Sequence, residues 1–288
     1  MVANSAISWT THTFNGWWGC FKVSEGCRNC YAETFAKRTG RSIWGPPATT
    51  ERRFFADKHW QEPLKWNAAA EKAGERARVF SASMSDVFED HPEVGPHRDR
   101  LFRLVEQTPW LDWQLLTKRP ENILRMIPEA WHTNPPPNWW QGTSVENQDA
   151  ADARIPHLLR VPAPVRFLSC EPLLGPVDLR SIPDPSAPGA WRFDALAGGW
   201  YLPASEDGYP EVTGDGPDMG GLISWVIVGG ESGPKHRPMN VDWLASLVDQ
   251  CQEAGVAVWV KQDSGPYPGK QGRIPDDLMI QQLPEVQP

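Results

Sequence analysis

Short apolar runs alternate with amphipathic stretches along most of the chain, and this alternation predicts the fold. Apolar or β-branched runs begin near residues 79, 113, 140, 165, 225 and 257, and each ends in small or charged residues. Helical patterns are expected at 31–40, 97–107, 121–127, 149–159 and 241–253. Strands that alternate with helices at intervals of about 25 to 35 residues are typical of parallel βαβ units.

A further strand is expected within residues 5–18, which are poor in helix formers and rich in Thr, Trp and Phe. We therefore predict an α/β fold, a single partial (β/α) barrel of six to seven parallel strands that spans residues 1–288 as one domain. Residues 41–75 are expected to be an irregular covering segment. Residues 181–222, rich in Pro, Gly, Asp and Ser, are expected to form an insertion before the penultimate strand, either a lid or a surface excursion.

Three of the five cysteines lie within eleven residues, between the first expected strand and the helix after it. They are Cys20, Cys27 and Cys30 in GCFKVSEGCRNCYAE, a C-x6-C-x2-C spacing. Soft sulfur ligands select zinc or iron–sulfur clusters, and three thiolates leave one iron of a [4Fe–4S] cluster open to another ligand. A zinc knuckle completed by His12 or another residue stays open as an alternative, as do three unrelated structural cysteines.

This loop resembles the cluster-binding loop of the radical S-adenosylmethionine superfamily. The stretch KVSEGCRNCYAE is also similar to a phage- and prophage-encoded three-cysteine-motif family of poorly defined function, as are Ile7, Trp9, Phe14, Asn15, Lys37 and Arg38. The resemblance implies a [4Fe–4S] cluster on the three cysteines, S-adenosylmethionine on its open iron, and an external electron donor. The match departs from the superfamily's usual C-x3-C-x2-C in its longer first interval, and Asn29 stands where an aromatic residue often precedes the last cysteine.

Polar residues repeatedly follow the expected strands, at the ends where barrel enzymes place their chemistry. Under the resemblance, the candidates to bind S-adenosylmethionine are Ser81, Ser83, Asp86, Glu146 and Glu231. The candidates to act on substrate are Lys118, Cys170 and Glu171, with Arg119, Lys261 and Asp263 as further strand-end charges.

Two of these candidates carry an explicit alternative. Glu231 ends a Gly-Gly-Glu stretch similar to a superfamily motif, but it follows the sixth expected strand instead of the second, and an ion pair with Arg237 explains it equally well. Cys170 could donate a hydrogen atom to a substrate radical, or it could be a buried inert thiol.

Composition and charge narrow the function further. A formal net charge of -8 and a pI near 5.4 argue against a broad basic face for duplex DNA, although a local nucleic-acid contact stays open. No apolar run approaches the roughly 18 residues that span a bilayer and no signal peptide is evident, so a cytoplasmic protein without a membrane partner is expected.

Hydrolase and dehydrogenase motifs such as H-E-x-x-H, G-x-S-x-G and G-x-G-x-x-G are absent. The resemblance implies a radical enzyme, and a polar small molecule of the nucleotide or nucleobase class is expected as its substrate. The alternative is a zinc-stabilised, non-catalytic binding protein of a phage modification or defence complex.

Overall fold

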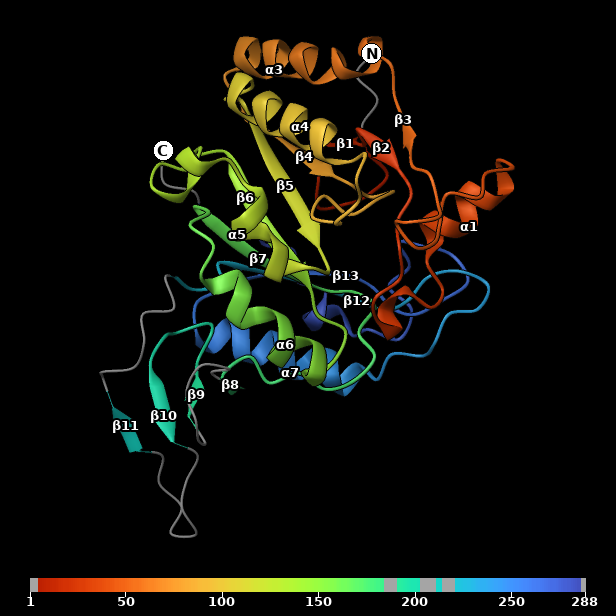
Figure 1. The fold of residues 1–288 in the computed structure, drawn as a ribbon. Coiled ribbons are helices and arrows are strands. Elements are labelled where there is room, and N and C mark those ends of the chain that lie inside the picture. Colours follow the sequence, from red (N-terminus) through yellow and green to blue (C-terminus); the bar gives the residue numbers. More distant parts are fainter. Residues whose placement is uncertain (1–4, 184–190, 203–210, 214–220, 286–288) are drawn as a thin grey trace. The chain divides into compact units, whose positions relative to one another are not determined.

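The computed structural model describes residues 5–183, 191–202, 211–213 and 221–285. Its main sheet has seven strands in the order β1-β4-β5-β6-β7-β12-β13 (Figure 1). This is the α/β partial-barrel sheet predicted from the sequence. Contacts between Cα atoms divide the chain into two compact units, Met1–Gly142 and Thr143–Pro288, where one domain was expected, and the division falls inside β6 (Trp139–Ser144).

The first unit holds three parallel strands with helices on one face. The strands are β1 (His12–Phe14), β4 (Ala77–Ser81) and β5 (Leu111–Thr117), in a register that pairs His12 with Val79 and Val79 with Trp113. The remaining elements are β2 (Trp17–Trp18), η1 (Glu25–Cys27), α1 (Tyr31–Arg38), β3 (Arg53–Phe54), α2 (Asp57–Trp60), α3 (Glu62–Ala73), α4 (Gly95–Gln107), η2 (Pro120–Asn122), α5 (Ile123–Met126) and η3 (Glu129–His132).

Tryptophan and phenylalanine rings fill the space between these strands and their helices. The Phe14 ring centroid lies 5.3 Å from that of Trp60, 6.4 Å from that of Trp66 and 5.8 Å from that of Trp113. All three contacts are edge-on, which is a favoured geometry for aromatic pairs. Trp60, Trp66 and Trp113 therefore have a packing role.

The segment 41–75 is not wholly irregular, because it contains α2 and α3. The sequence of α3 has Pro63 in its first turn, a run of three alanines, and Gly74 directly after its end with a φ of 70°. Each of these favours a helix with a defined start and stop. The prediction gave too much weight to Trp44 and to Pro46 and Pro47, which lie before the helix.

The second unit holds β7 (Val165–Cys170), β12 (Trp225–Gly229) and β13 (Ala257–Gln262), which pair in parallel. Its helices are α6 (Gln148–Leu159) and α7 (Val241–Glu253), and a short η4 (Asp276–Leu278) follows β13. Asn147 and Asn240 cap the two helices by accepting hydrogen bonds from backbone N–H groups of the first turn.

The insertion begins with short strands that reach the core of the second unit. A four-stranded antiparallel sheet has the order β11-β10-β9-β8, from β8 (Ile182–Pro183), β9 (Arg192–Phe193), β10 (Trp200–Leu202) and β11 (Glu211–Thr213). Ile182 and Phe193 are buried in the same apolar cluster as Leu158 and Leu247. Residues 184–190, 203–210 and 214–220 of the predicted insertion lie outside the described residues, so the choice between lid and surface excursion stays a prediction.

Among the residues that the structure describes, no helix has the length and apolar character needed to cross a membrane.

The aromatic core predicts a large penalty for removing its central ring. Trp113 is fully buried, and its indole N–H donates to Thr108 Oγ1 at 2.8 Å. Trp113→Ala is expected to lower the free energy of unfolding by about 3–5 kcal/mol, measured from urea denaturation followed by circular dichroism. Tyr267→Ala, at a ring that is 69% exposed, is the control and should change it by less than about 0.5 kcal/mol.

Candidate functional site

The first cysteine follows a tight passage of the backbone beyond the ends of β1 and β4. Gly19 donates its N–H to the Met84 carbonyl at 3.0 Å and has a φ of 116°. A Cβ atom there would lie 2.6 Å from Arg52 Cδ and 2.6 Å from the Ile43 carbonyl oxygen. Only glycine fits this position, which places Cys20 against the segment that carries Arg52.

The other two cysteines flank the start of α1. Cys27 closes the η1 turn, where its N–H donates to the Ser24 carbonyl at 2.9 Å. Cys30 precedes α1, and its carbonyl accepts hydrogen bonds from the backbone N–H and the hydroxyl of Thr34. The three thiols are partly buried and none is in a disulfide, so all three are available as ligands.

A buried carboxylate at the end of β4 organises the neighbouring strand end. Asp86 Oδ1 accepts from the Thr117 hydroxyl at 2.6 Å and the Phe88 N–H at 3.0 Å, and Oδ2 accepts from the Lys118 N–H at 3.0 Å and Arg119 Nη1 at 2.8 Å. Both oxygens are thus fully engaged. Asp86, predicted to bind a cofactor, is held here by the protein itself.

The ion pairs continue from Asp86 to a second buried pair. Arg119 Nη2 lies 3.9 Å from Glu89 Oε1, and Glu89 receives two hydrogen bonds from Arg52, at 2.8 and 2.9 Å. The side chains of Arg52 and Glu89 are 0% and 1% exposed. Asp86, Arg119, Glu89 and Arg52 form what we call the buried ion network.

This network holds the cysteine loop directly. Arg119 Nη2 donates to the Phe21 carbonyl at 2.6 Å, and its Nη1 lies 3.8 Å from Cys20 Sγ. Arg52 donates to the Gly45 carbonyl at 3.0 Å. The start of the cysteine loop is therefore fixed to the ends of β4 and β5 through one guanidinium group.

Burial and two neighbouring carboxylates disfavour the thiolate form of Cys20. Burial raises the pKa of Cys20 to about 12, Asp86 and Glu89 act in the same direction, and Arg119 opposes them. Burial also raises the pKa of Cys30. Burial alone would lower the pKa of Arg119, but Asp86 and then Cys20 outweigh it, and the net direction is upward. A metal ion would reverse the balance at the thiols, since a bound cation stabilises thiolates.

The donor set fits a three-thiolate cluster better than a closed zinc site. His12, the suggested fourth zinc ligand, is buried and stacks on Trp66 with 4.5 Å between ring centroids. In the described part of the chain, no three His, Cys, Asp or Glu side chains are already drawn together as a metal site. Binding a cluster at the three thiols therefore requires them to come closer together than they are in this structure.

The two predicted serines end β4 and take part in its turn. Ser81 is buried as the last residue of the strand, and Ala82 follows with a φ of 70°, a conformation that L-residues other than Asn and Asp rarely adopt. Ser83 Oγ bonds to the Asn15 side chain, and the Ser83 carbonyl accepts from the Tyr31 hydroxyl at 2.7 Å. The turn thereby links β1, β4 and the start of α1.

The remaining candidates lie in the second unit, and each acid there has a basic partner. Glu146 pairs with Arg154 at 2.7 Å, Glu171 with Lys261, and Asp263 with Arg273 at 2.8 Å. Glu231 pairs with Arg237 at 2.6 Å, the ion pair expected as the alternative to a ligand role. Cys170 is fully buried in the apolar core, where burial and the nearby Cys251 raise its pKa, as expected of an inert thiol.

Sequence reasoning missed Glu89 and the structural roles of Arg52 and Thr117. Nothing in a single sequence distinguishes a charge that will be buried from one that stays in water. The only signal for Glu89 is its position directly after Val87 and Phe88, in a turn rich in apolar residues. Arg119 was noticed, but as a ligand for substrate and not as the partner of Asp86.

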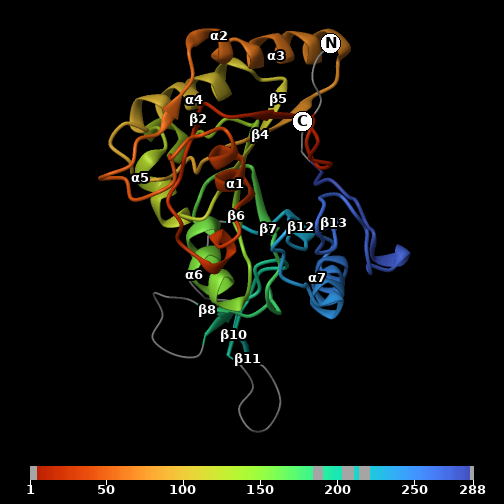
Figure 2. The same cartoon turned by 90° about the vertical axis from the view of Figure 1, so that its right-hand side faces the viewer.

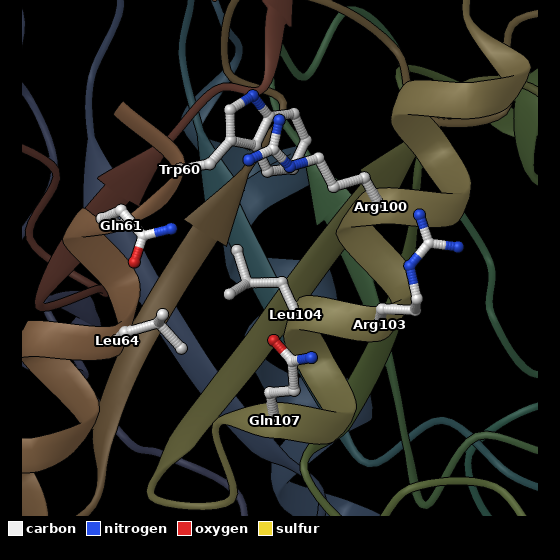
Figure 3. Close-up of a pocket in the computed structure, with 7 residues that line it drawn as sticks. All are labelled: Trp60, Gln61, Leu64, Arg100, Arg103, Leu104 and Gln107. Carbon is white, nitrogen blue, oxygen red and sulfur yellow. The ribbon is translucent and has the colours of Figure 1, made fainter. Parts of the chain in front are cut away.

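A pocket of about 320 Å³ lies between α2, α3 and α4 in the first unit (Figure 3). Arg100 crosses it to stack on the Trp60 ring at 4.6 Å, and Leu64, Leu104 and Gln107 complete much of its wall. None of the cysteines or strand-end residues lines it, so it is separate from the site built on the cysteine loop.

Comparison with known proteins gives one family and a group of solved structures. The model of a family described as "Protein of unknown function (DUF5131)" matches residues 4–280. A search among curated proteins finds no match. The chain is similar to solved structures of spore photoproduct lyase, all of them mutants.

Three of these structures illustrate the extent of the similarity. One with bound AdoMet and dinucleoside spore photoproduct has a TM-score of 0.42 and 14% identity, and covers 60% of this chain and 48% of its own. A second, with dinucleoside spore photoproduct, has a TM-score of 0.38 and 15% identity, and the match covers 54% of this chain and 44% of that one. A third has a TM-score of 0.47 and 12% identity, and the match covers 91% of this chain and 79% of that one. The chain spans about half the length of the first.

Removing one member of the buried ion network should destabilise the protein strongly. Asp86→Ala leaves the Arg119 charge buried without its main partner, and a loss of about 3–5 kcal/mol in the free energy of unfolding is expected in urea titrations. The control is Asp90→Ala, because Asp90 and Arg125 form an exposed pair at 2.8 Å and should contribute at most about 1 kcal/mol. Equal losses for the two variants would show that the network is not structural.

The ion pair of Asp263 predicts a pH-dependent contribution to stability. Burial raises the pKa of Asp263, but hydrogen bonds from Arg273 and Ser264 outweigh it and hold the pKa below its usual range. A carboxylate with a lowered pKa stabilises the fold above its unfolded pKa of about 4, and this stability is lost as the pH falls through the folded value. The urea midpoint of Asp263→Asn should therefore lie below that of the natural protein at pH 7, and the gap should narrow below pH 4. A gap that is independent of pH would contradict this.

Proposed function

This chain belongs to the DUF5131 family of proteins of unknown function, and we propose that it is an iron–sulfur enzyme that uses S-adenosylmethionine. Cys20, Cys27 and Cys30 would hold a [4Fe–4S] cluster, with no fourth ligand from the protein. The observation that carries the proposal is the cysteine loop itself. It presents three unpaired thiols beyond the ends of parallel strands, and a buried ion network fixes its start.

When bound, a reduced cluster and S-adenosylmethionine supply a 5′-deoxyadenosyl radical that removes a hydrogen atom from a substrate, at the expense of one electron from an external donor. The residues of this chain would bind the cofactors, keep the site dry and position the substrate.

Arg119 is the positioning residue of this site. Its guanidinium lies 3.8 Å from Cys20 Sγ and holds the Phe21 carbonyl at 2.6 Å, so it would place a positive charge beside one thiolate and orient the loop. Hydrogen bonds and charges around the sulfurs tune the potential of an iron–sulfur site. Asp86 and Glu89 in turn hold Arg119 in place.

The aromatic residues before the loop would exclude water. Phe14 and Trp17 are at most 1% exposed, and both precede Cys20 within seven residues. An apolar shell of this kind limits solvent access to a cluster. For the substrate we propose a polar small molecule of the nucleotide or nucleobase class, because hydroxyl and charged side chains, among them Ser83, Asp86 and Lys118, follow β4 and β5.

The proposal is tested by anaerobic reconstitution with iron and sulfide, followed by metal analysis and electron paramagnetic resonance of the dithionite-reduced protein. About four irons per chain, and a signal that changes shape when S-adenosylmethionine is added, are expected. One tightly held zinc, with no iron and no signal after reconstitution, would overturn the proposal in favour of a zinc-stabilised, non-catalytic binding protein.

Single alanine substitutions should separate ligand cysteines from structural ones. Cys20→Ala, Cys27→Ala and Cys30→Ala are each expected to lose most of the bound iron and of the visible absorbance, while circular dichroism stays close to that of the natural protein. Cys251→Ala, in the core of the second unit, is the matched control and should keep the cluster. Full absorbance in any of the first three variants would remove that cysteine from the ligand set.

A further inference from the structure

Large apolar side chains are exposed around the cysteine loop. Six large hydrophobic side chains are exposed in the described part of the chain, and four of them, Phe21, Val23, Tyr31 and Phe35, lie within fifteen consecutive residues. Helix α1, which carries two of the four, stands at the right of Figure 1 and faces the viewer in Figure 2. Exposed apolar groups that gather in one place mark interaction sites.

The exposed rings of α1 are held in fixed positions. Tyr31 is 57% exposed although its hydroxyl donates to the Ser83 carbonyl, and Phe35 is 48% exposed while its edge meets Trp18 with 5.8 Å between centroids. Tyr31 and Phe35 are four residues apart, so they lie on the same side of the helix, about 6 Å apart along its axis. A planar ligand could stack on these rings without the entropic cost of ordering them.

Arginines without carboxylate partners surround the rings. Arg53 lies over the Trp18 ring at 4.6 Å and the Phe55 ring at 4.7 Å. Burial, and then the positive charge of Arg41, lower the pKa of Arg53. Within the described residues, the guanidinium groups of Arg38, Arg41 and Arg53 form no hydrogen bond or ion pair. A bound anion would use their donors.

The charge of this region is opposite to that of the whole chain. Residues 20–53 carry seven Lys and Arg against three Asp and Glu, in a protein whose formal net charge is -8. One of the three acids, Glu33, is already paired with both Lys22 and Lys37. Arg52 is buried and paired with Glu89, so the positive charge that can attract a polyanion to this region is that of Arg38, Arg41 and Arg53.

We propose that Trp18, Tyr31, Phe35, Arg38, Arg41 and Arg53, here called the aromatic–arginine surface, bind single-stranded nucleic acid. Bases would stack on the exposed rings while the guanidinium groups bind phosphates, the combination that single-strand-binding proteins use. The proposal rests on the proposed function in one respect, because it names the polymer that would bring a nucleobase beside the cysteine loop. Binding itself requires no cluster, so it can be tested on the protein as purified.

The observations favour single strands over two other polyanions. An acidic protein would pair with the arginines, but its carboxylates offer nothing to stack on the fixed rings. Duplex DNA keeps its bases stacked on one another, and the acidic remainder of the chain would repel its long phosphate array. A single strand offers unstacked bases to the aromatic rings and phosphates to the arginines of this surface.

The test is fluorescence anisotropy with a labelled 15-nucleotide thymidine strand, an abasic strand of the same length and a 15-base-pair duplex, at several salt concentrations. The natural protein should bind the thymidine strand about tenfold more tightly than the abasic strand or the duplex, since one stacked base contributes about a factor of ten. Three bound phosphates predict a slope of log K against log salt of about −2.

Single variants separate stacking from charge. Phe35→Ala should weaken binding of the thymidine strand about tenfold and leave the abasic strand unchanged. Arg38→Ala and Arg41→Ala should weaken both strands and each reduce the salt slope by about 0.7. Tyr267→Ala and Arg103→Ala, an exposed ring and an exposed cation outside the surface, are the controls and should bind normally.

Other outcomes overturn the proposal. Equal affinity for thymidine and abasic strands with no effect of Phe35→Ala, together with competition by polyglutamate, would indicate a docking site for an acidic protein. Equal binding of the duplex, or no binding at 50 mM salt, would also refute it. Because none of these measurements needs iron, a failure here leaves the cluster proposal untouched, and a missing cluster leaves this one standing.

Discussion

The ion pair between Arg119 and Asp86 is the interaction on which the cysteine loop depends. It is buried, with side-chain exposures of 8% and 7%, and the same guanidinium reaches the Phe21 carbonyl and Cys20 Sγ. A buried pair of this kind seldom adds net stability over an apolar replacement, but it is costly to break. Its place at a strand end is best explained by what it positions. Arg119 thus contacts Asp86, 33 residues before it in the chain, and Phe21, 98 residues before it.

The same network sets the electrostatics of the loop. Two buried carboxylates face one thiol, with one guanidinium between them, and burial disfavours a thiolate further. A site with this balance stays neutral until a cation arrives, and then exchanges protons for metal. Cys20 is thus favoured as a neutral thiol and would become a thiolate when a metal binds. This coupling explains how Cys20 can lie beside Asp86 and Glu89 without repulsion.

The sequence predicted the strands and helices well, because the apolar runs and their helical partners leave a strong periodic signal. The strands near 113, 140, 165, 225 and 257 and the helix at 241–253 are confirmed. The sequence-based prediction failed at α3, because the tryptophan and proline residues before this helix suggested an irregular segment. The site was predicted only in part. Spacing drew attention to the three cysteines, but the partners of Asp86 are set by tertiary packing, which brings Arg119, Glu89 and Arg52 together from separate segments.

Some arginines near the cysteine loop are buried and others are exposed. This difference bears on how a ligand would reach the loop. Arg52 and Arg119 are buried and paired inside the protein, whereas Arg38 and Arg41 are exposed and Arg53 lies over the Trp18 ring. The inner arginines hold the start of the cysteine loop, and under our proposal the outer ones would attract a polyanion. Both sets lie within or beside the segment that contains the cysteines. A ligand drawn to the outer face would therefore arrive at the loop that the inner network holds in place.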